Sequence, residues 1–244
     1  MQRSLAIPSS CGAAPARTIR AKLLLDGAHY EELIVRAVTQ AQVSVWISTA
    51  NLKTMMVEAP IGSRARASGR YVSFFETLGE LSRRGVDVCI LHASPPSGPL
   101  KRELVRLAKN ASGIKMRQCP RVHLKMIAVD GKLLYLGSAN LTGAGLGAKG
   151  DGRRNFEMGI LTDSEAMLDA AQERFDRIWR GRECSACTMR RDCDKPLDTI
   201  GLAKTRPMPA SRAAPASPAA PASGVRITSR AATKRISRSP SSPR

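Results

Sequence analysis

Hydrophobic and polar residues alternate with two different periods between residues 26 and 179. Apolar residues three or four positions apart predict helices, and short runs of apolar and β-branched residues predict strands. The predicted helices cover 26–41, 74–85, 100–109 and 164–179. The predicted strands cover 43–47, 86–91, 114–117, 122–129, 132–136 and 156–161. This alternation is typical of one α/β domain.

The fourth and fifth predicted strands are separated by the pair Asp130-Gly131. This pair strongly favours a β-hairpin with a two-residue turn. Such a turn pairs residues whose numbers add up to 261, so it places His123 opposite Ser138. The sequence therefore predicts the register of the hairpin as well as its position.

Because side chains alternate between the two faces of a strand, this register collects polar residues on one face of the hairpin. That face would carry Arg121, His123, Lys125, Ser138 and Asn140. The opposite face would be mostly apolar, with Leu124, Met126, Ala128, Leu133, Tyr135 and Ala139. The apolar face is thus predicted to pack against the core, and the polar face to carry the catalytic side chains.

The chain is strongly basic, with 39 Lys and Arg against 20 Asp and Glu and a net charge of +19. Residues 201–244 hold nine of these positive charges and no acidic residue, which leaves +10 on the rest. A polyanionic partner is favoured, with nucleic acid ahead of an anionic membrane. The candidate nucleic-acid-binding residues are Arg64, Arg66, Arg70 and Arg121.

Composition divides the chain into four parts. Residues 1–21 are predicted to be a disordered start, residues 22–182 a folded domain and residues 183–200 a Cys-rich knot. Residues 201–244 form a disordered basic tail rich in Ala, Pro and Ser, either a passive extension or an arm that raises encounter rates with nucleic acid. An organellar transit peptide is the alternative for this N-terminal segment, which contains arginines and no acidic residue.

The cell compartment follows from two features. No apolar run approaches the ~20 residues that a membrane-spanning helix requires, and the start lacks a convincing signal segment. Six cysteines, three of them between 184 and 193, do not resemble a secreted disulfide framework. A cytoplasmic protein without a transmembrane segment is expected.

The polar face of the hairpin suits the chemistry of a phosphodiester. Lys125 and Asn140 can hold the non-bridging oxygens while His123 attacks phosphorus, and Ser138 adds a hydroxyl to the same face. Asp130 lies in the turn, where a carboxylate that stabilises its own backbone is a stronger interpretation than a catalytic one.

The same residues form a longer motif. It reads His-Leu-Lys, four residues, Asp130, six residues, then Gly137-Ser138-Ala139-Asn140. This pattern resembles the HKD signature of the phospholipase D superfamily, with Asp130 and Gly137 as its structural positions. The later Asn155-Phe156-Glu157 resembles the acidic motif of the same families. The resemblance extends from about Lys22 to Trp179 and implies an α-β-α sandwich, a mixed sheet flanked by helices.

The resemblance also implies a mechanism that needs no catalytic metal. One histidine forms a phosphohistidine intermediate, and a second histidine protonates the leaving group and later activates water. The counterpart of Glu157 in these families orients the histidine, whereas a surface salt bridge is the plain alternative for this residue.

Only one copy of the motif is present. Neither His29 nor His92 is followed by Lys two positions later. Superfamily members with one copy resemble this chain and work as homodimers, so an isologous dimer is expected. A nuclease acting on DNA or RNA is the preferred function. A phospholipid phosphodiesterase or phosphatidyltransferase, and a nucleic-acid-binding module with weak or vestigial activity, are the alternatives.

The cysteines of the knot have spacing typical of a metal or cluster site. Cys184, Cys187 and Cys193 lie within a span of ten residues after the last predicted helix. Cys119, just before the catalytic strand, is the candidate fourth ligand, whereas Cys89 is expected in the core. Zinc and an iron–sulfur cluster both fit, as structural groups only, and unliganded thiols are the alternative.

Overall fold

The computed structural model describes residues 18–59, 67, 69–109 and 113–200. The predicted tail, Arg64 and Arg66 lie outside these ranges, as does most of the predicted N-terminal segment. Within the described residues, no helix is long and apolar enough to cross a membrane.

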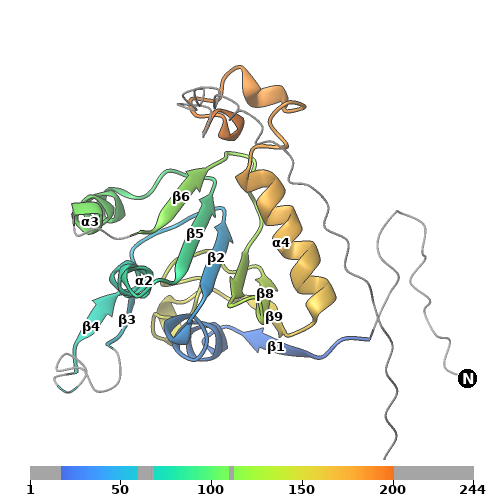
Figure 1. The fold of residues 1–244 in the computed structure, drawn as a ribbon. Helices are drawn as coiled ribbons and strands as arrows, with labels where there is room; N and C mark the ends of the chain where they lie inside the picture. Colours follow the sequence, from blue (N-terminus) through green and yellow to red (C-terminus); the bar gives the residue numbers. More distant parts are fainter. Residues whose placement is uncertain (1–17, 60–66, 68, 110–112, 201–244) are drawn as a thin grey trace, which may run out of the picture. The chain divides into compact units, whose positions relative to one another are not determined.

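A seven-stranded mixed sheet organises the domain (Figure 1), with the strand order β1-β9-β8-β7-β2-β5-β6. Strand β2 pairs in parallel with β5, and β5 with β6, whereas the pairs on the other side of β2 are antiparallel. The strands are β1 Ala21–Leu25, β2 Ser44–Thr49, β5 Asp87–His92, β6 Lys115–Gln118, β7 Met126–Val129, β8 Leu133–Gly137 and β9 Met158–Thr162. The sequence did not predict β1, nor the small sheet of β3 Met56–Glu58 and β4 Tyr71–Ser73.

Helices cover both faces of this sheet, which confirms the α-β-α arrangement (Figure 1). One face packs against a π-helix, η1, and two α-helices, and the other face against a single long α-helix. The helices are η1 His29–Val35, η2 Val38–Gln40, α2 Phe74–Arg83, α3 Gly98–Lys109 and α4 Glu165–Trp179. The helix predicted at 26–41 is therefore two short helices of non-α type.

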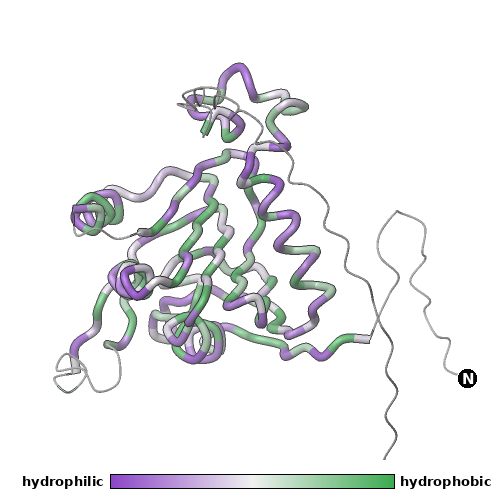
Figure 2. Tube along the Cα trace, in the orientation of Figure 1, coloured by the Kyte–Doolittle hydropathy of each residue, from purple (hydrophilic) through white to green (hydrophobic). Residues whose placement is uncertain are grey.

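Each face of the sheet has its own apolar core. Ile127, Val129 and Tyr135 pack beneath α2 and η1, whereas Met126, Ala128 and Leu134 pack beneath α4. Figure 2 shows apolar residues concentrated along the strands and mixed with polar residues along the helices. The prediction that only one face of the hairpin packs against a core is wrong, because both faces are buried.

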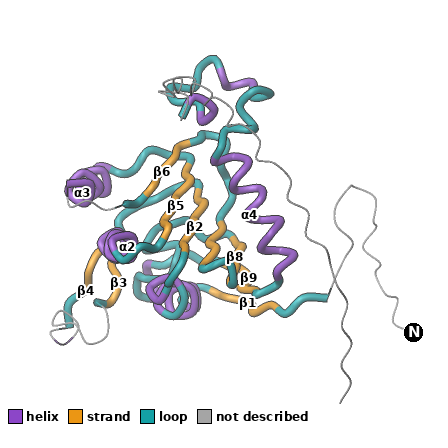
Figure 3. The backbone as a smooth tube through the Cα atoms, viewed as in Figure 1, coloured by secondary structure: helices purple, strands orange, loops and turns teal. Residues whose placement is uncertain are grey.

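Beyond α4, the chain from Arg180 to Ile200 is mainly loop (Figure 3). It contains only two short 3-10 turns, η4 Thr188–Arg190 and η5 Leu197–Thr199. Leu197 is its one apolar residue buried in the core beneath α4. Few apolar contacts therefore attach this segment to the domain.

Candidate functional site

The register of the hairpin differs from the prediction by one residue. Val129 pairs with Leu133 and Met126 with Leu136, so three residues, Asp130 to Lys132, join the strands. A donor–acceptor bond from Lys132 N to Val129 O (3.0 Å) closes the turn, and both Asp130 and Gly131 have positive φ. Because neighbouring side chains point to opposite faces of a strand, a shift of one residue would put His123 and Ser138 on opposite faces of the hairpin. The predicted pairing of these two residues is therefore wrong.

The candidate catalytic residues instead lie beyond the ends of the strands. His123 and Lys125 precede β7, Ser138 and Asn140 follow β8, and Glu157 precedes β9. Since β7 and β9 run antiparallel to β2 and β8, all five residues lie at the sheet edge where β2 and β8 end. In open α/β sheets, ligands bind at this carboxyl-terminal edge.

His123 and Lys125 form the first contact at this edge. The Lys125 ammonium lies 3.0 Å from His123 Nε2 and 3.1 Å from Nδ1, and it also donates to the His123 carbonyl at 3.0 Å. The ammonium thus lies beside the ring, at nearly the same distance from both of its nitrogens. A cation so close to an imidazole is well placed to bind an anionic group that contacts the ring.

Partial burial lowers the pKa of Lys125, and the negative charge of Glu157 opposes this shift. The lysine is half-buried, whereas the His123 side chain is exposed. A partly desolvated ammonium has lost part of its hydration, so an anionic ligand that binds beside His123 can compensate its charge.

Ser138 and Glu157 form the second contact. The Ser138 hydroxyl donates to Glu157 Oε2 and accepts from Met158 N at 3.1 Å. Asn155 Nδ2 donates to the other carboxylate oxygen of Glu157 at 3.0 Å. In this structure Glu157 therefore contacts Ser138 and Asn155 rather than the His123 ring.

Asp26 fixes the backbone of Glu157, a role that the sequence did not indicate. Glu157 N donates to Asp26 Oδ1 at 2.9 Å, and Asp26 N donates to Glu157 O at 3.0 Å. Asp26 adopts φ +43 to make both bonds. The pair Asp26-Gly27 is a turn signal of the same type as Asp130-Gly131, which was the available clue.

Asn140 makes the third contact, with the end of β2. Its Oδ1 accepts from Asn51 N at 3.2 Å and from Thr49 Oγ1 at 3.3 Å. These donors orient the amide, and its Nδ2 has no hydrogen-bond partner among the described residues, so it can donate to a ligand. Thr49 and Asn51 were missed, although polar residues directly after a buried strand are a usable signal.

Asp130 stabilises the backbone of a distant segment, whereas the prediction was that it stabilises the backbone of its own turn. Its Oδ1 accepts from Val43 N at 2.7 Å and Ser44 N at 2.9 Å, and both carboxylate oxygens accept from Gln42 N. Partial burial raises the pKa of Asp130, but these backbone N–H groups outweigh it, so the net pKa lies below the ordinary value. The motif aspartate thus attaches the hairpin to the start of β2.

Gly137 occupies a position where no side chain fits. A Cβ atom there would lie 2.8 Å from the Gly159 Cα of the neighbouring strand and would also collide with the Tyr135 side chain. Glycine lets β8 and β9 approach closely just before Ser138, so the motif glycine sets the position of the site's second contact.

The family model described as "Cardiolipin synthase, PLD-like domain" matches residues 34–179. The chain belongs to the phospholipase D superfamily. The matched range includes every candidate catalytic residue and the whole of the sheet except β1. No curated protein matches the chain.

Solved structures with a similar arrangement include two bacterial proteins. Nuc from Salmonella typhimurium, a phospholipase D family member, is 20% identical with a TM-score of 0.47, and NucT from Helicobacter pylori is 15% identical with a TM-score of 0.46. Each match covers 66% of this chain and 95% of the other. The archaeal chromatin protein TrmBL2 is 14% identical with a TM-score of 0.41, over 66% of this chain and 52% of the other.

The predicted nucleic-acid-binding arginines have different positions in this phospholipase D-like domain. Arg70 is exposed just before β4. Arg121 is exposed, but its guanidinium hydrogen-bonds to Cys187, which lowers the pKa of that thiol, with a smaller contribution from Met189 N. Arg121 thus lies against the cysteine-containing segment and not beside His123 on a polar face.

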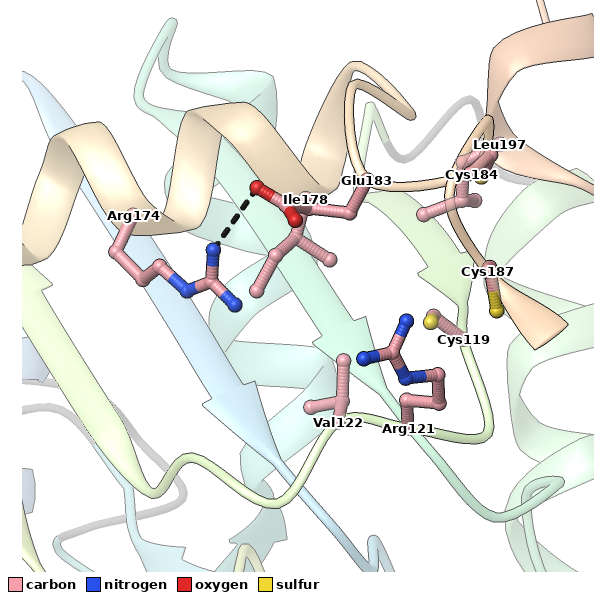
Figure 4. A pocket seen from close by; sticks show the side chains of 9 residues that line it. All are labelled: Cys119, Arg121, Val122, Arg174, Ile178, Glu183, Cys184, Cys187 and Leu197. Carbon is pink, nitrogen blue, oxygen red and sulfur yellow. Dashed lines mark hydrogen bonds and ion pairs between the residues drawn. The ribbon is translucent and has the colours of Figure 1, made fainter. Parts of the chain in front are cut away.

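The four cysteines proposed as metal ligands line shared cavities. A cavity of about 80 Å³ is lined by Cys119, Cys184 and Cys187 together with Arg121 (Figure 4). A neighbouring cavity of about 50 Å³ is lined by these three cysteines and Cys193. Among the described residues, no three His, Cys, Asp or Glu side chains are already arranged around a common metal position. Cys89 is buried, as predicted.

Proposed function

We propose that this chain is a nuclease of the phospholipase D superfamily that hydrolyses DNA or RNA without a catalytic metal. The observation that carries the proposal is the contact between Lys125 and the His123 imidazole at the carboxyl-terminal edge of the sheet. It supports the proposal because an attacking imidazole would then lie beside the cation that neutralises the phosphoryl oxygens. The net charge of +19 favours nucleic acid among the phosphodiesters.

The proposed reaction has two steps. A His123 ring nitrogen forms a bond to phosphorus, the bond from phosphorus to the leaving oxygen breaks, and a second histidine gives that oxygen a proton. Water then gives up a proton to the second histidine and attacks phosphorus, which breaks the nitrogen–phosphorus bond. Lys125 and Asn140 Nδ2 bind the non-bridging oxygens in both steps, and the hydrogen bond between Ser138 and Glu157 joins the ends of β8 and β9 beside them.

The description of the matching family model as a cardiolipin synthase domain supplies a second candidate. Cardiolipin synthases act on phospholipids, and an apolar surface adjoins Lys125 in this chain. A cavity of about 430 Å³ there is lined by Leu124, Lys125, Leu136 and Met167, among others. A phospholipid phosphodiesterase or phosphatidyltransferase would use the same His123–Lys125 pair.

A substrate panel tests the proposed function. We expect full-length protein to cleave labelled DNA or RNA at an unchanged rate when EDTA is added at the start of the reaction, because no step uses a metal. Vesicles that contain an anionic phospholipid should remain intact. Lipid turnover without nucleic-acid cleavage would replace the nuclease by the second candidate. Immediate loss of activity with EDTA would contradict metal-free chemistry.

We further propose that the active form is an isologous homodimer, because the mechanism needs two histidines and the motif supplies one. Apolar side chains are exposed next to the candidate site. Phe156 is 96% exposed, Met158 58% and Leu124 38%. Exposed apolar residues around a functional site mark an interface, and burial between two copies would bring two His123 side chains to one cleft.

Mixing experiments test the dimer. If each cleft needs His123 from both copies, an equimolar mixture of wild type and His123→Ala after subunit exchange should retain about one quarter of the activity of the same total of wild type. Independent sites would retain about one half, which would contradict a shared cleft. Met158→Glu should convert the dimer to a monomer in light scattering. The matched control is Val105→Glu, at a residue 53% exposed on α3, and it should stay dimeric.

A further inference from the structure

Two separate segments bring four cysteines together. Cys119 follows β6 directly, whereas Cys184, Cys187 and Cys193 belong to the loop after α4. All four side chains are partly buried and none forms a disulfide. Figure 4 shows Cys119 and Cys187 bordering the same cavity from these two segments. The second cavity adds Cys193 to the same group.

Basic side chains surround the cysteines. The charged residues that line the first cavity are Arg121, Arg174 and Glu183, and those that line the second are Arg121, Arg190, Lys195 and Asp192, so positive charges outnumber negative ones in both. Arg121 also hydrogen-bonds to Cys187. Four thiolates around a divalent cation leave an excess negative charge, which these cations would balance.

We propose that Cys119, Cys184, Cys187 and Cys193 bind one Zn²⁺ through their thiolates. Zinc prefers four sulfur ligands in structural sites, often with two of them in a Cys-x2-Cys pair such as Cys184 and Cys187. The side chains turn toward the shared cavities when the metal enters, since metal binding and the ordering of ligands are coupled.

The proposed metal has a structural task that apolar packing does not perform. The segment from Arg180 to Ile200 has two short turns and one core residue, Leu197. Short segments with so little buried apolar area are commonly held by metals. Zinc would attach this segment to Cys119, four residues before His123, and so restrain the loop that carries the nucleophile.

Metal analysis of the full-length protein tests this inference without any activity assay. Wild type purified from zinc-supplemented, reducing culture should contain roughly one equivalent of zinc. Cys119→Ser and Cys187→Ser should each retain less than about a tenth of it. The matched control is Cys89→Ser, which changes a buried cysteine of β5 outside both cavities and should keep the full amount.

A second measurement uses unmodified protein, in case a variant does not fold. Co²⁺ exchanged into wild type should give the intense sulfur-to-metal absorption bands of a tetrahedral thiolate site. Four freely titrating thiols with no bound metal would overturn the proposal, as would full zinc content in Cys119→Ser. Iron with inorganic sulfide would overturn the assignment to zinc. None of these outcomes depends on whether the chain is a nuclease.

Discussion

Replacement of His123 by Ala should lower nucleic-acid cleavage by about 10⁴-fold or more, because it removes the proposed nucleophile. His123 is exposed and contacts Lys125 only through its ring and carbonyl, so the domain should keep its fold. Single-turnover cleavage of labelled DNA and RNA measures the effect. Binding affinity for the same oligonucleotides should change less than about threefold, since the arginines and lysines remain.

Two further observations make this experiment decisive. Lys101→Ala, at an exposed lysine on α3, is the matched control and should cleave at the wild-type rate. Wild type quenched in mid-reaction should carry an acid-labile phosphoryl adduct on His123. If His123→Ala keeps wild-type cleavage, the site lies elsewhere. If neither protein cleaves and both bind, the chain is a nucleic-acid-binding module with a vestigial site.

The sequence predicted most elements of the fold because their periodicity was strong. The strands β2, β5 and β6 and the helices α2, α3 and α4 begin and end within about two residues of the prediction. The edge strand β1 was missed, since its Leu23 and Leu25 face solvent and only Leu24 is buried. A five-residue strand with one buried position has no periodicity to detect.

The residues of the candidate site were easier to predict than their arrangement. The motif spacing identified His123, Lys125 and Asn140, but the register followed from an assumed two-residue turn. A third residue in the loop, Lys132, shifts the pairing by one position. The wrong register does not change which residues belong to the site, because these residues lie beyond the ends of the paired strands. There, the alternation of side chains between the two faces no longer determines where each side chain points.

Contacts between distant segments could not be derived from local pattern. The predictions for Asp130 and Arg121 rested on their own neighbours in sequence, a turn and a β-strand. Their actual partners, Gln42 to Ser44 and Cys187, are 86 to 88 and 66 positions away. A single sequence fixes neither pairing, since both depend on how the sheet and the segment after α4 come together.

The Asp130 carboxylate should contribute strongly to stability, because it joins the hairpin to β2. Asp130→Ala should lower the free energy of unfolding by about 3 kcal/mol, from lost charge-assisted hydrogen bonds and the strain of Ala at φ +55. Asp130→Gly separates the two causes, since glycine adopts positive φ freely. Asp130→Asn keeps one acceptor oxygen and should lose about half as much. Urea denaturation at pH 7 measures each value.

The pH dependence of this contribution follows from the direction of the shift. The pKa of Asp130 is lower in the folded protein than in the unfolded chain, so its stabilisation is complete above the unfolded pKa, about 3.9. It is lost as the pH falls through the lower folded pKa, when the carboxylate is protonated. The stability difference between wild type and Asp130→Asn should therefore be constant from about pH 7 to 5 and shrink below about pH 4. A difference that stayed the same at pH 3 would show that the ionised carboxylate is not what joins the hairpin to β2.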